Sequence, residues 1–104
     1  MVETQVFRAL ADPTRRAVFE RLCRGESSVS ELTARFSVSQ PAISQHLAAL
    51  KAAGLVCERR EGRNAYYRCD PKGLDSLSSW VQRYRVAWPG RLQKLKRVLK
   101  EMDP

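Results

Sequence analysis

The amino-acid sequence predicts a small, mainly helical domain that carries one β-hairpin, an α+β fold. Helical segments with recognisable start signals fill the first half of the chain. Two short runs of strand-type residues then flank a turn that contains Gly62. A long apolar stripe at helical spacing ends the sequence. The 104 residues have room for a single domain with one modest core.

Two helices are expected before residue 26. The apolar side of the first is formed by Val2, Val6, Phe7 and Leu10. Asp12 and Pro13 begin the second, because aspartate caps free backbone amides and proline suits a first helical turn. This helix is expected to run to about Arg24 and to end at Gly25. Its inward-facing residues are Val18, Phe19 and Leu22.

The next two helices form a helix-turn-helix, expected over about residues 29–53. Ser28 and Glu31 have the spacing of a capping box, in which the hydroxyl and the carboxylate satisfy each other's backbone amides. They open a short helix that carries Leu32 and Phe36. After a short turn, Ser39 can cap a fourth helix from Gln40 to Ala53, which Gly54 closes. Two helices joined by about three or four residues are typical of this motif.

A β-hairpin, or wing, is expected over about residues 55–70. Leu55 to Arg60 and Ala65 to Cys69 are strand-like, and residues 61–64 supply the turn. A two-residue turn at Gly62-Arg63 places Cys57 opposite Arg68 and Cys69 opposite Val56. The thiols of Cys57 and Cys69 then point to opposite faces of the hairpin, so a bond between them requires a change of register.

A long helix over about residues 71–102 is expected to dimerise the protein. Its apolar stripe is Leu74, Leu77, Val81, Tyr84, Trp88, Leu92, Leu95, Leu99 and Met102. This stripe is about 28 residues or ~42 Å long, more than a domain of this size covers by itself. A second copy of the same helix is the simplest partner. Pro89 removes a backbone hydrogen bond, so a kink or a break is expected there.

The charge favours a nucleic-acid partner. Nineteen lysines and arginines against eleven acidic residues give a net charge of +8, which attracts polyanions. An anionic membrane surface would be attracted equally, but no segment is apolar enough to span a bilayer. The chain lacks a signal-peptide pattern at its start, so a cytoplasmic location is expected. Phosphate-binding glycine loops, Cys–His dyads and paired carboxylates are missing, so no enzyme is expected.

Three motifs resemble the ArsR/SmtB family of winged-helix repressors. They are residues 7–16 (FRALADPTRR), residues 40–47 with 50–56 (QPAISQHL, LKAAGLV), and residues 59–63 (RREGR) followed by Tyr66 and Tyr67. The resemblance implies a homodimeric repressor that binds an inverted-repeat operator in double-stranded DNA and leaves it on a signal. It also implies that the first and last helices form the dimer interface. The residues expected there are Val6, Leu10, Leu77, Val81, Tyr84, Trp88, Leu92 and Leu95.

The fourth helix is expected to read bases in the major groove. Ile43, Leu47 and Leu50 share its core face. The outward residues are Gln40, Pro41, Ser44, Gln45 and Ala48, mostly short side chains that let the backbone approach. Gln45 can pair with adenine, Pro41 or Ala48 can touch a thymine methyl, and Ser44 can bond to a base edge or a phosphate. The alternative is an ordinary solvated helix face.

Basic residues elsewhere are expected to hold the DNA backbone. The wing residues are Arg59, Arg60, Arg63 and Asn64, which can bind phosphates or enter the minor groove. Glu58 and Glu61 leave open a hairpin whose arginines are only ion-paired. Arg15 and Arg16 can add a phosphate contact, or be solvated, or pair with Glu20.

No metal site or cofactor is expected. Some relatives hold a metalloid with two cysteines on the third helix, where this chain has Thr33 and Arg35. Another known site needs histidines on the last helix, and none follows Asp70. The single histidine, His46, is expected to pack or to form a hydrogen bond. The resemblance is therefore to a branch of the family with no evident metal site.

Two other functions remain open. An architectural DNA-binding protein with little sequence preference would have the same charge and fold. A repressor that senses thiol oxidation could use Cys23, Cys57 or Cys69, although structural thiols, with Cys23 buried, are the favoured interpretation.

Overall fold

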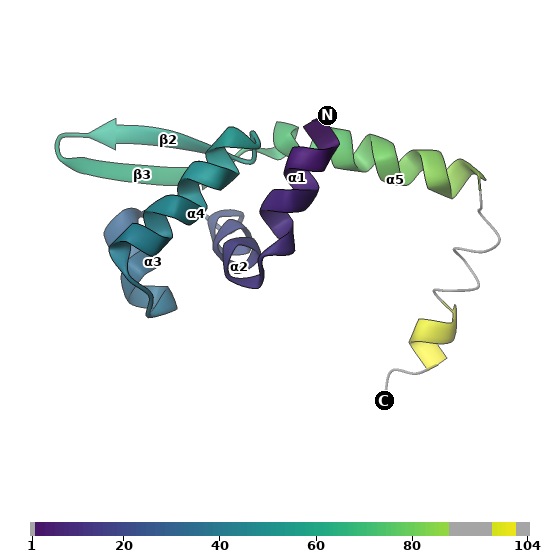
Figure 1. The fold of residues 1–104 in the computed structure, drawn as a ribbon, viewed down its shortest axis with the longest axis horizontal. Coiled ribbons are helices and arrows are strands. Elements are labelled where there is room, and N and C mark those ends of the chain that lie inside the picture. Colours follow the sequence, from purple (N-terminus) through teal and green to yellow (C-terminus); the bar gives the residue numbers. More distant parts are fainter. Residues whose placement is uncertain (1, 88–96, 102–104) are drawn as a thin grey trace.

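The computed structural model describes residues 2–87 and 97–101, and it confirms a mainly helical domain with a small antiparallel sheet (Figure 1). In chain order the elements are α1 (Val2–Ala11), α2 (Pro13–Leu22), β1 (Ser27–Ser28), α3 (Val29–Phe36), α4 (Gln40–Ala52), β2 (Val56–Glu61), β3 (Asn64–Cys69), the 3-10 turn η1 (Pro71–Leu74) and α5 (Asp75–Ala87). The helices form one body, from which the wing and α5 extend in opposite directions (Figure 1).

The predicted helix starts are confirmed by their capping hydrogen bonds. The Asp12 carboxylate accepts a bond of 3.0 Å from the amide of Arg15, and this bond holds the pKa of Asp12 below its ordinary value. Ser28 and Glu31 form the reciprocal capping box at 3.1 and 3.2 Å. The Ser39 hydroxyl accepts a bond of 3.2 Å from the amide of Ala42. These bonds fix where α2, α3 and α4 begin.

The helix ends differ slightly from the prediction. α2 ends at Leu22 with Cys23 as its C-cap, about two residues before the expected end at Arg24. α4 ends at Ala52. Gly54, two residues later, has a φ of +77°, a conformation that glycine adopts without steric cost. Between α3 and α4, Ser37 lies in the left-handed region with φ +53°, which produces the turn of the helix-turn-helix.

The sheet has a strand that the sequence did not predict. Its order is β1-β3-β2, and the hairpin has the expected register, with Cys57 opposite Arg68 and Cys69 opposite Val56. The additional strand β1 is two residues long and pairs Ser28 with Tyr66. Two residues are too short for an alternating pattern, and Ser28 already gives the signal of a helix cap. Strand β1 ties the start of α3 directly to the wing.

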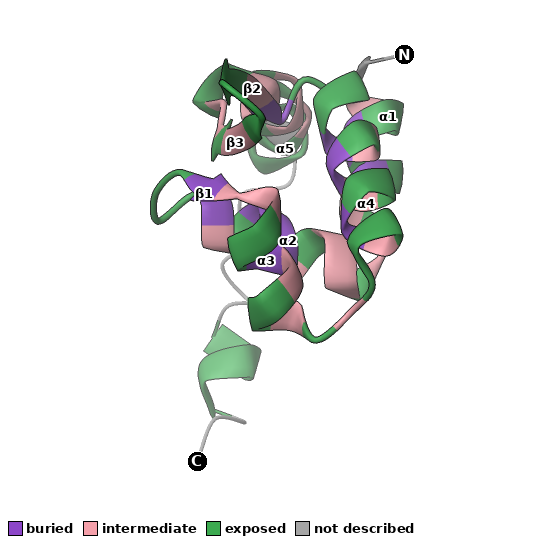
Figure 2. Cartoon of the chain, turned by 90° about the vertical axis from the view of Figure 1, so that its left-hand side faces the viewer, coloured by how far each residue is buried: buried purple, intermediate pink, exposed green. Residues whose placement is uncertain are grey.

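The core lies where the helices face one another (Figure 2). Its buried residues come from every helix of the first half and from the start of the wing: Val6, Ala9, Val18, Phe19, Leu22, Leu32, Ile43, Leu47, Leu50, Ala53, Leu55 and Val56. Phe7 is an exception to the predicted inner face of α1, because 41% of it is exposed. Its ring instead lies edge-on to Trp80 of α5, with the ring centroids 5.1 Å apart.

The last predicted helix is described in part. Residues 71–74 form a 3-10 turn, so the α-helix begins at Asp75 and not at Pro71, and it is described to Ala87. Residues 97–101 are helical. Trp88, Pro89, Leu92, Leu95 and Met102 lie outside the described residues, and so does the predicted kink or break. Within the described ranges no helix is both long enough and apolar enough to cross a membrane.

Candidate nucleic-acid interface

Helix α4 has one buried face and one exposed face. Ile43, Leu47 and Leu50 are almost completely buried and anchor the helix in the core. The five residues predicted to read bases are all exposed: Gln40, Pro41, Ser44, Gln45 and Ala48. Hydrophobic burial on one side therefore fixes which side chains α4 can present to a ligand.

A polar cleft of about 210 Å³ lies between the wing and the first turns of α3 and α4. Helix α4 contributes Gln40 and Ser44 to its lining. The wing contributes Arg60, Arg63 and Asn64. The structure thus brings two of the predicted base-reading residues together with three of the predicted wing residues.

Glu58 organises the wing beside this cleft. Its carboxylate accepts hydrogen bonds from Lys51 at 2.9 Å and from the Tyr67 hydroxyl at 3.1 Å. Arg60 lies 3.3 Å from the same carboxylate, but 74% of its side chain remains exposed. The bonds from Lys51 and Tyr67 hold the pKa of Glu58 below its ordinary value. Arg60 is therefore oriented by Glu58 and still accessible to a phosphate.

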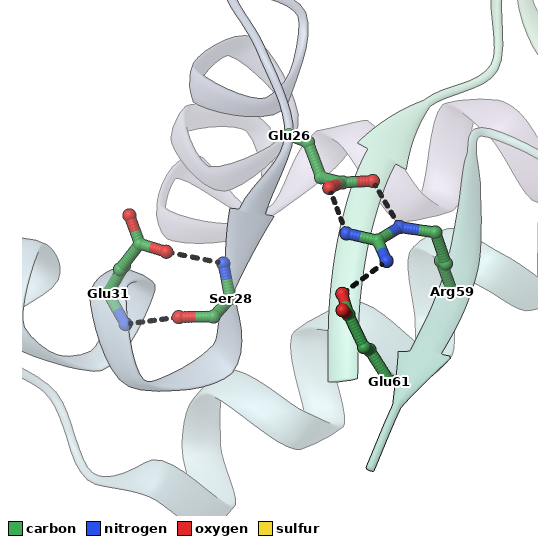
Figure 3. Close-up of polar contacts among 5 residues, drawn as sticks. All are labelled: Glu26, Ser28, Glu31, Arg59 and Glu61. Atoms are coloured by element: carbon green, nitrogen blue, oxygen red, sulfur yellow. Dashed lines mark hydrogen bonds and ion pairs between the residues drawn. The ribbon is translucent and has the colours of Figure 1, made fainter. Parts of the chain in front are cut away.

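Arg59 has a different environment from its neighbour Arg60. Successive side chains of a strand point to opposite faces, so Arg59 points away from the cleft. Its guanidinium is paired with Glu26 at 2.6 Å and with Glu61 at 2.8 Å (Figure 3). Both carboxylates raise the pKa of Arg59. Of the predicted wing arginines, Arg59 is the one held by two carboxylates. For this residue the structure therefore agrees with the alternative in which the wing arginines are only ion-paired.

Arg63 and Asn64 lie at the turn of the hairpin, and both are exposed. Gly62 precedes them with φ +61°, which the two-residue turn requires. Arg63 has no ion pair with any residue that the structure describes. Its charge is thus available to an external anion.

The side chains of Arg15 and Arg16 both form hydrogen bonds within the protein. The Nε of Arg15 donates to Nδ1 of His46 at 3.4 Å, which links α2 to α4. Nη1 of Arg16 donates to the carbonyl oxygen of Leu10 at 2.9 Å, while the residue stays exposed. Neither forms an ion pair with Glu20 in the described part of the chain. The hydrogen-bonding role predicted for His46 is observed.

A second surface, the aromatic face, consists of Phe7, Trp80, Val81 and Tyr84 on α1 and α5. The ring centroids of Trp80 and Tyr84 are 4.7 Å apart, and Val81 and Tyr84 are both exposed, at 40% and 46%. Arg83 and Glu3 form an ion pair of 3.6 Å that also joins α5 to α1. These contacts make one continuous surface from two helices that are far apart in the sequence.

Not every residue predicted for a dimer interface lies on this aromatic face. Val6 is fully buried within the core of the chain and presents no surface to a partner. The periodicity placed Val6 on the apolar side of the first helix, and in the structure this side chain fills the core. Leu10 and Leu77 are half-buried against that core. Trp88, Leu92 and Leu95 belong to the residues that are not described.

One of the three thiols departs from the prediction, and the other two lie on the predicted opposite faces of the hairpin. Cys23 was expected to be buried, but the residue is exposed at the end of α2. Cys57 and Cys69 are half-buried on opposite faces of the hairpin, and the Cys57 thiol donates to Asp70 at 3.6 Å. Burial and the neighbouring Cys69 thiol raise the pKa of the Cys23 thiol to about 11. Among the residues described, no group of three or more metal-binding side chains comes together.

One residue that contacts the wing was missed by the sequence analysis. Glu26, in the loop between α2 and β1, pairs with an arginine 33 positions later. Nothing in the local sequence signals this contact, because it depends on how β1 lies beside β3.

Comparison with known proteins gives consistent matches. Residues 12–57 match the family model described as "Bacterial regulatory protein, arsR family". The chain is 48% identical over 80 residues to the HTH-type transcriptional regulator Rv2034 of Mycobacterium tuberculosis. This match covers 77% of this chain and 75% of that protein. It is 34% identical to the transcriptional repressor SdpR of Bacillus subtilis, over 73% of this chain and 84% of the repressor.

The fold matches solved structures as well. A crystal structure of an ArsR family transcriptional regulator superimposes with a TM-score of 0.79 at 31% identity. The match covers 86% of this chain and 92% of that one. The arrangement of helices and wing described above is therefore shared with that regulator.

Proposed function

Because the chain belongs to the ArsR family of bacterial regulatory proteins and is a DNA-binding transcriptional regulator, we propose that it represses transcription as a homodimer on an inverted-repeat operator. The observation that carries this proposal is the shared cleft of α4 and the wing, which gathers exposed amide, hydroxyl and guanidinium groups on one side of the protein. The whole chain acts as one winged helix-turn-helix domain in the cytoplasm, with no enzymatic activity of its own.

In this proposal α4 enters the major groove. Its exposed side chains near the helix start are short, apart from Gln40 and Gln45, so the backbone can come close to the bases. The side-chain amide of Gln45 offers one donor and one acceptor, which can pair with the N7 acceptor and the N6 donor of adenine. Pro41 and Ala48 supply apolar contact for a thymine methyl, and Ser44 reaches a base edge or a phosphate.

The basic residues bind the backbone on either side of that groove. Arg60, Arg63 and Asn64 extend from the wing toward a phosphate or the minor groove. Arg16 is exposed at the start of α2 and adds a further phosphate contact, while Arg15 is hydrogen-bonded to His46. Phosphate contacts of this kind set the position of the protein, and the base contacts of α4 set its sequence preference.

The aromatic face supplies the dimer. Val81 and Tyr84 present apolar surface on α5 that a second copy can cover, and Leu10 and Leu77 lie half-buried beside the core. The apolar spacing of the sequence adds Trp88, Leu92 and Leu95 to the proposed interface, and these three lie outside the described residues. A two-fold dimer places two copies of α4 about one helical turn of DNA apart, which matches an inverted repeat. Sedimentation at micromolar concentration should give twice the mass of one chain, and Val81→Asp should lower it to a single chain.

Fluorescence anisotropy tests the function directly. The probe is a labelled duplex from upstream of the protein's own gene, compared with a scrambled duplex of the same composition at near-physiological salt. A specific regulator prefers the first by about 10³-fold or more. Equal, weak and strongly salt-dependent binding to every duplex, including duplexes selected from a random pool, would favour an architectural protein instead.

A further inference from the structure

The guanidinium of Arg59 links the wing to the helical body through side chains, in addition to the backbone pairing of β1 with β3. Its Nε lies 3.2 Å from Oε2 of Glu26, and its Nη2 lies 2.6 Å from Oε1 of the same carboxylate (Figure 3). The remaining Nη1 donates to Glu61 at 2.8 Å. A two-point contact between guanidinium and carboxylate fixes orientation as well as distance. Arg59 is thus held by groups from two different parts of the chain.

The three-stranded sheet explains how this contact crosses the molecule. Tyr66 of the central strand is paired with Arg59 on one side and with Ser28 on the other. The guanidinium carbon of Arg59 lies 4.7 Å from the centroid of the Tyr66 ring. Arg59 therefore passes over Tyr66 to reach Glu26, which lies just before β1. A flat guanidinium suits both the ring and the carboxylate, which a lysine would not.

This contact is well placed to hold the wing. Glu26 lies two residues before Ser28, the cap of α3, so it is fixed to the helix-turn-helix. Arg59 lies one residue before Arg60, whose side chain lines the cleft on the opposite face of the strand. A displacement of the backbone at Arg59 would therefore also move Arg60, the next residue of the strand. The hydrogen bond from Arg59 also lowers the pKa of Glu26, so the carboxylate stays charged at neutral pH.

We propose that Glu26 and Arg59 are positioning residues for DNA binding, a clamp that holds the wing at the spacing from α4 at which Arg60 and Arg63 meet the duplex. In this arrangement Arg59 does not bind a phosphate itself. The inference rests on the proposed function, in which α4 and the wing contact one duplex together.

The clamp predicts that removing one negative charge weakens DNA binding instead of strengthening it. Glu26→Gln removes a negative charge from a protein that binds a polyanion, so simple electrostatics predicts tighter binding. Loss of the clamp predicts weaker binding, because the wing then has to be ordered when DNA binds. The matched control is Glu61→Gln, which also takes a carboxylate from Arg59. Glu61 lies on the same strand as Arg59 and cannot join the wing to the helices.

Anisotropy on the duplex that the unmodified protein prefers should show Glu26→Gln binding about two- to fivefold more weakly, the range of a partly exposed ion pair. Glu61→Gln should bind as well as the unmodified protein or slightly better. Because Arg59 also faces Glu61, the reversed pair, Glu26→Arg with Arg59→Glu, is made together with Glu61→Gln; it then has the net charge of the Glu61→Gln control and should recover part of the loss. Unchanged or tighter binding by Glu26→Gln, an equal loss in Glu61→Gln, or no recovery in the reversed pair would overturn the clamp.

Amide hydrogen exchange of the DNA-free protein tests the clamp independently of the proposed function. Glu26→Gln should speed exchange in residues 57–67 while leaving α2 and α4 unchanged, and the reversed pair should restore protection. Unaltered exchange in the wing would overturn the clamp even if DNA binding had changed. Faster exchange in a protein that binds no duplex would keep the clamp and reject the proposed function.

Discussion

Gly73, in the 3-10 turn after the wing, lies with its backbone directly against that of Gly54 at the end of α4. A Cβ atom added to Gly73 would be 2.8 Å from the carbonyl carbon of Gly54 and 2.9 Å from Cα of Leu55, and closer still to the Gly54 oxygen. The amide of Asp70 also donates to the carbonyl of Leu55 at 2.8 Å. The chain therefore leaves the wing by crossing the end of the proposed recognition helix, where only a glycine fits.

Gly73→Ala should destabilise the fold, because the atoms that the new methyl meets are backbone and cannot move aside. We expect a loss of about 1–3 kcal/mol, typical of overpacking, and a melting temperature several degrees lower by circular dichroism. Ser78→Ala, at an exposed site on α5, is the control and should melt like the unmodified protein. An unchanged melting temperature for Gly73→Ala would mean that the two glycines do not meet.

Gln45→Ala should reduce sequence preference more than overall affinity, since an amide that pairs with one base contributes about 1–3 kcal/mol of discrimination. Anisotropy on the preferred and scrambled duplexes gives the ratio of the two affinities. Gln82→Ala, which removes an exposed glutamine from α5, should leave that ratio unchanged. An equal loss on both duplexes would show that Gln45 does not contact a base.

Arg63→Ala should weaken binding to all duplexes alike and lower the slope of log affinity against log salt by about one unit, the effect of one lost phosphate contact. The measurement is a salt titration between low and physiological ionic strength. Arg24→Ala removes the same charge from an exposed position just after α2 and should keep the slope. If both variants behave alike, Arg63 acts only through net charge.

The stability of the wing should depend on the charge of Glu58. Hydrogen bonds from Lys51 and Tyr67 lower its pKa in the folded protein below the ordinary value of 4.5. A depressed carboxyl pKa stabilises the fold above the ordinary value, and this contribution is lost as the pH falls through the folded value. Glu58→Gln should therefore melt at a lower temperature than the unmodified protein at pH 7.

The same variant should lose less of its melting temperature between pH 6 and pH 3, because it has no carboxylate left to protonate at this position. Lys51→Gln should also show a smaller acid dependence than the unmodified protein, because it removes the hydrogen bond that contributes most to lowering the pKa of Glu58. Parallel curves for Glu58→Gln and the unmodified protein would contradict a depressed pKa at Glu58.

Cys23 should react slowly with alkylating reagents although the residue is exposed. Burial of its thiol, followed by the hydrogen bond with Cys69 and the charge of Glu20, raises its pKa to about 11. Only the thiolate is a nucleophile, so iodoacetamide at pH 8 should modify Cys23 about tenfold or more slowly than a free cysteine peptide. Mass spectrometry of the peptide that contains Cys23 measures the rate.

Cys69→Ala removes the second cause of that shift and should speed the reaction of Cys23, whereas Cys57→Ala should not. A rate equal to that of the free peptide would show that the thiol of Cys23 is solvated.

The sequence by itself determined the helices of the first half, the helix-turn-helix and the register of the hairpin. Each depends on bonds between near neighbours, such as Ser28 with Glu31 three residues apart, or on a two-residue turn that leaves one register. Hydrophobic spacing also gave the buried face of α4, and hence the exposed residues proposed to read DNA. The charges and the motifs of the family then indicated the function.

Only the tertiary structure decided which arginines of the wing remain available. Arg59 and Arg60 are adjacent and equal in charge, but Arg59 meets Glu26 from 33 positions away while Arg60 lines the cleft. Likewise, Val6 fills the core and Phe7 meets Trp80 from α5. Such pairings depend on how separate elements pack, and a local pattern of charge or hydrophobicity does not specify the partner of a side chain across the fold.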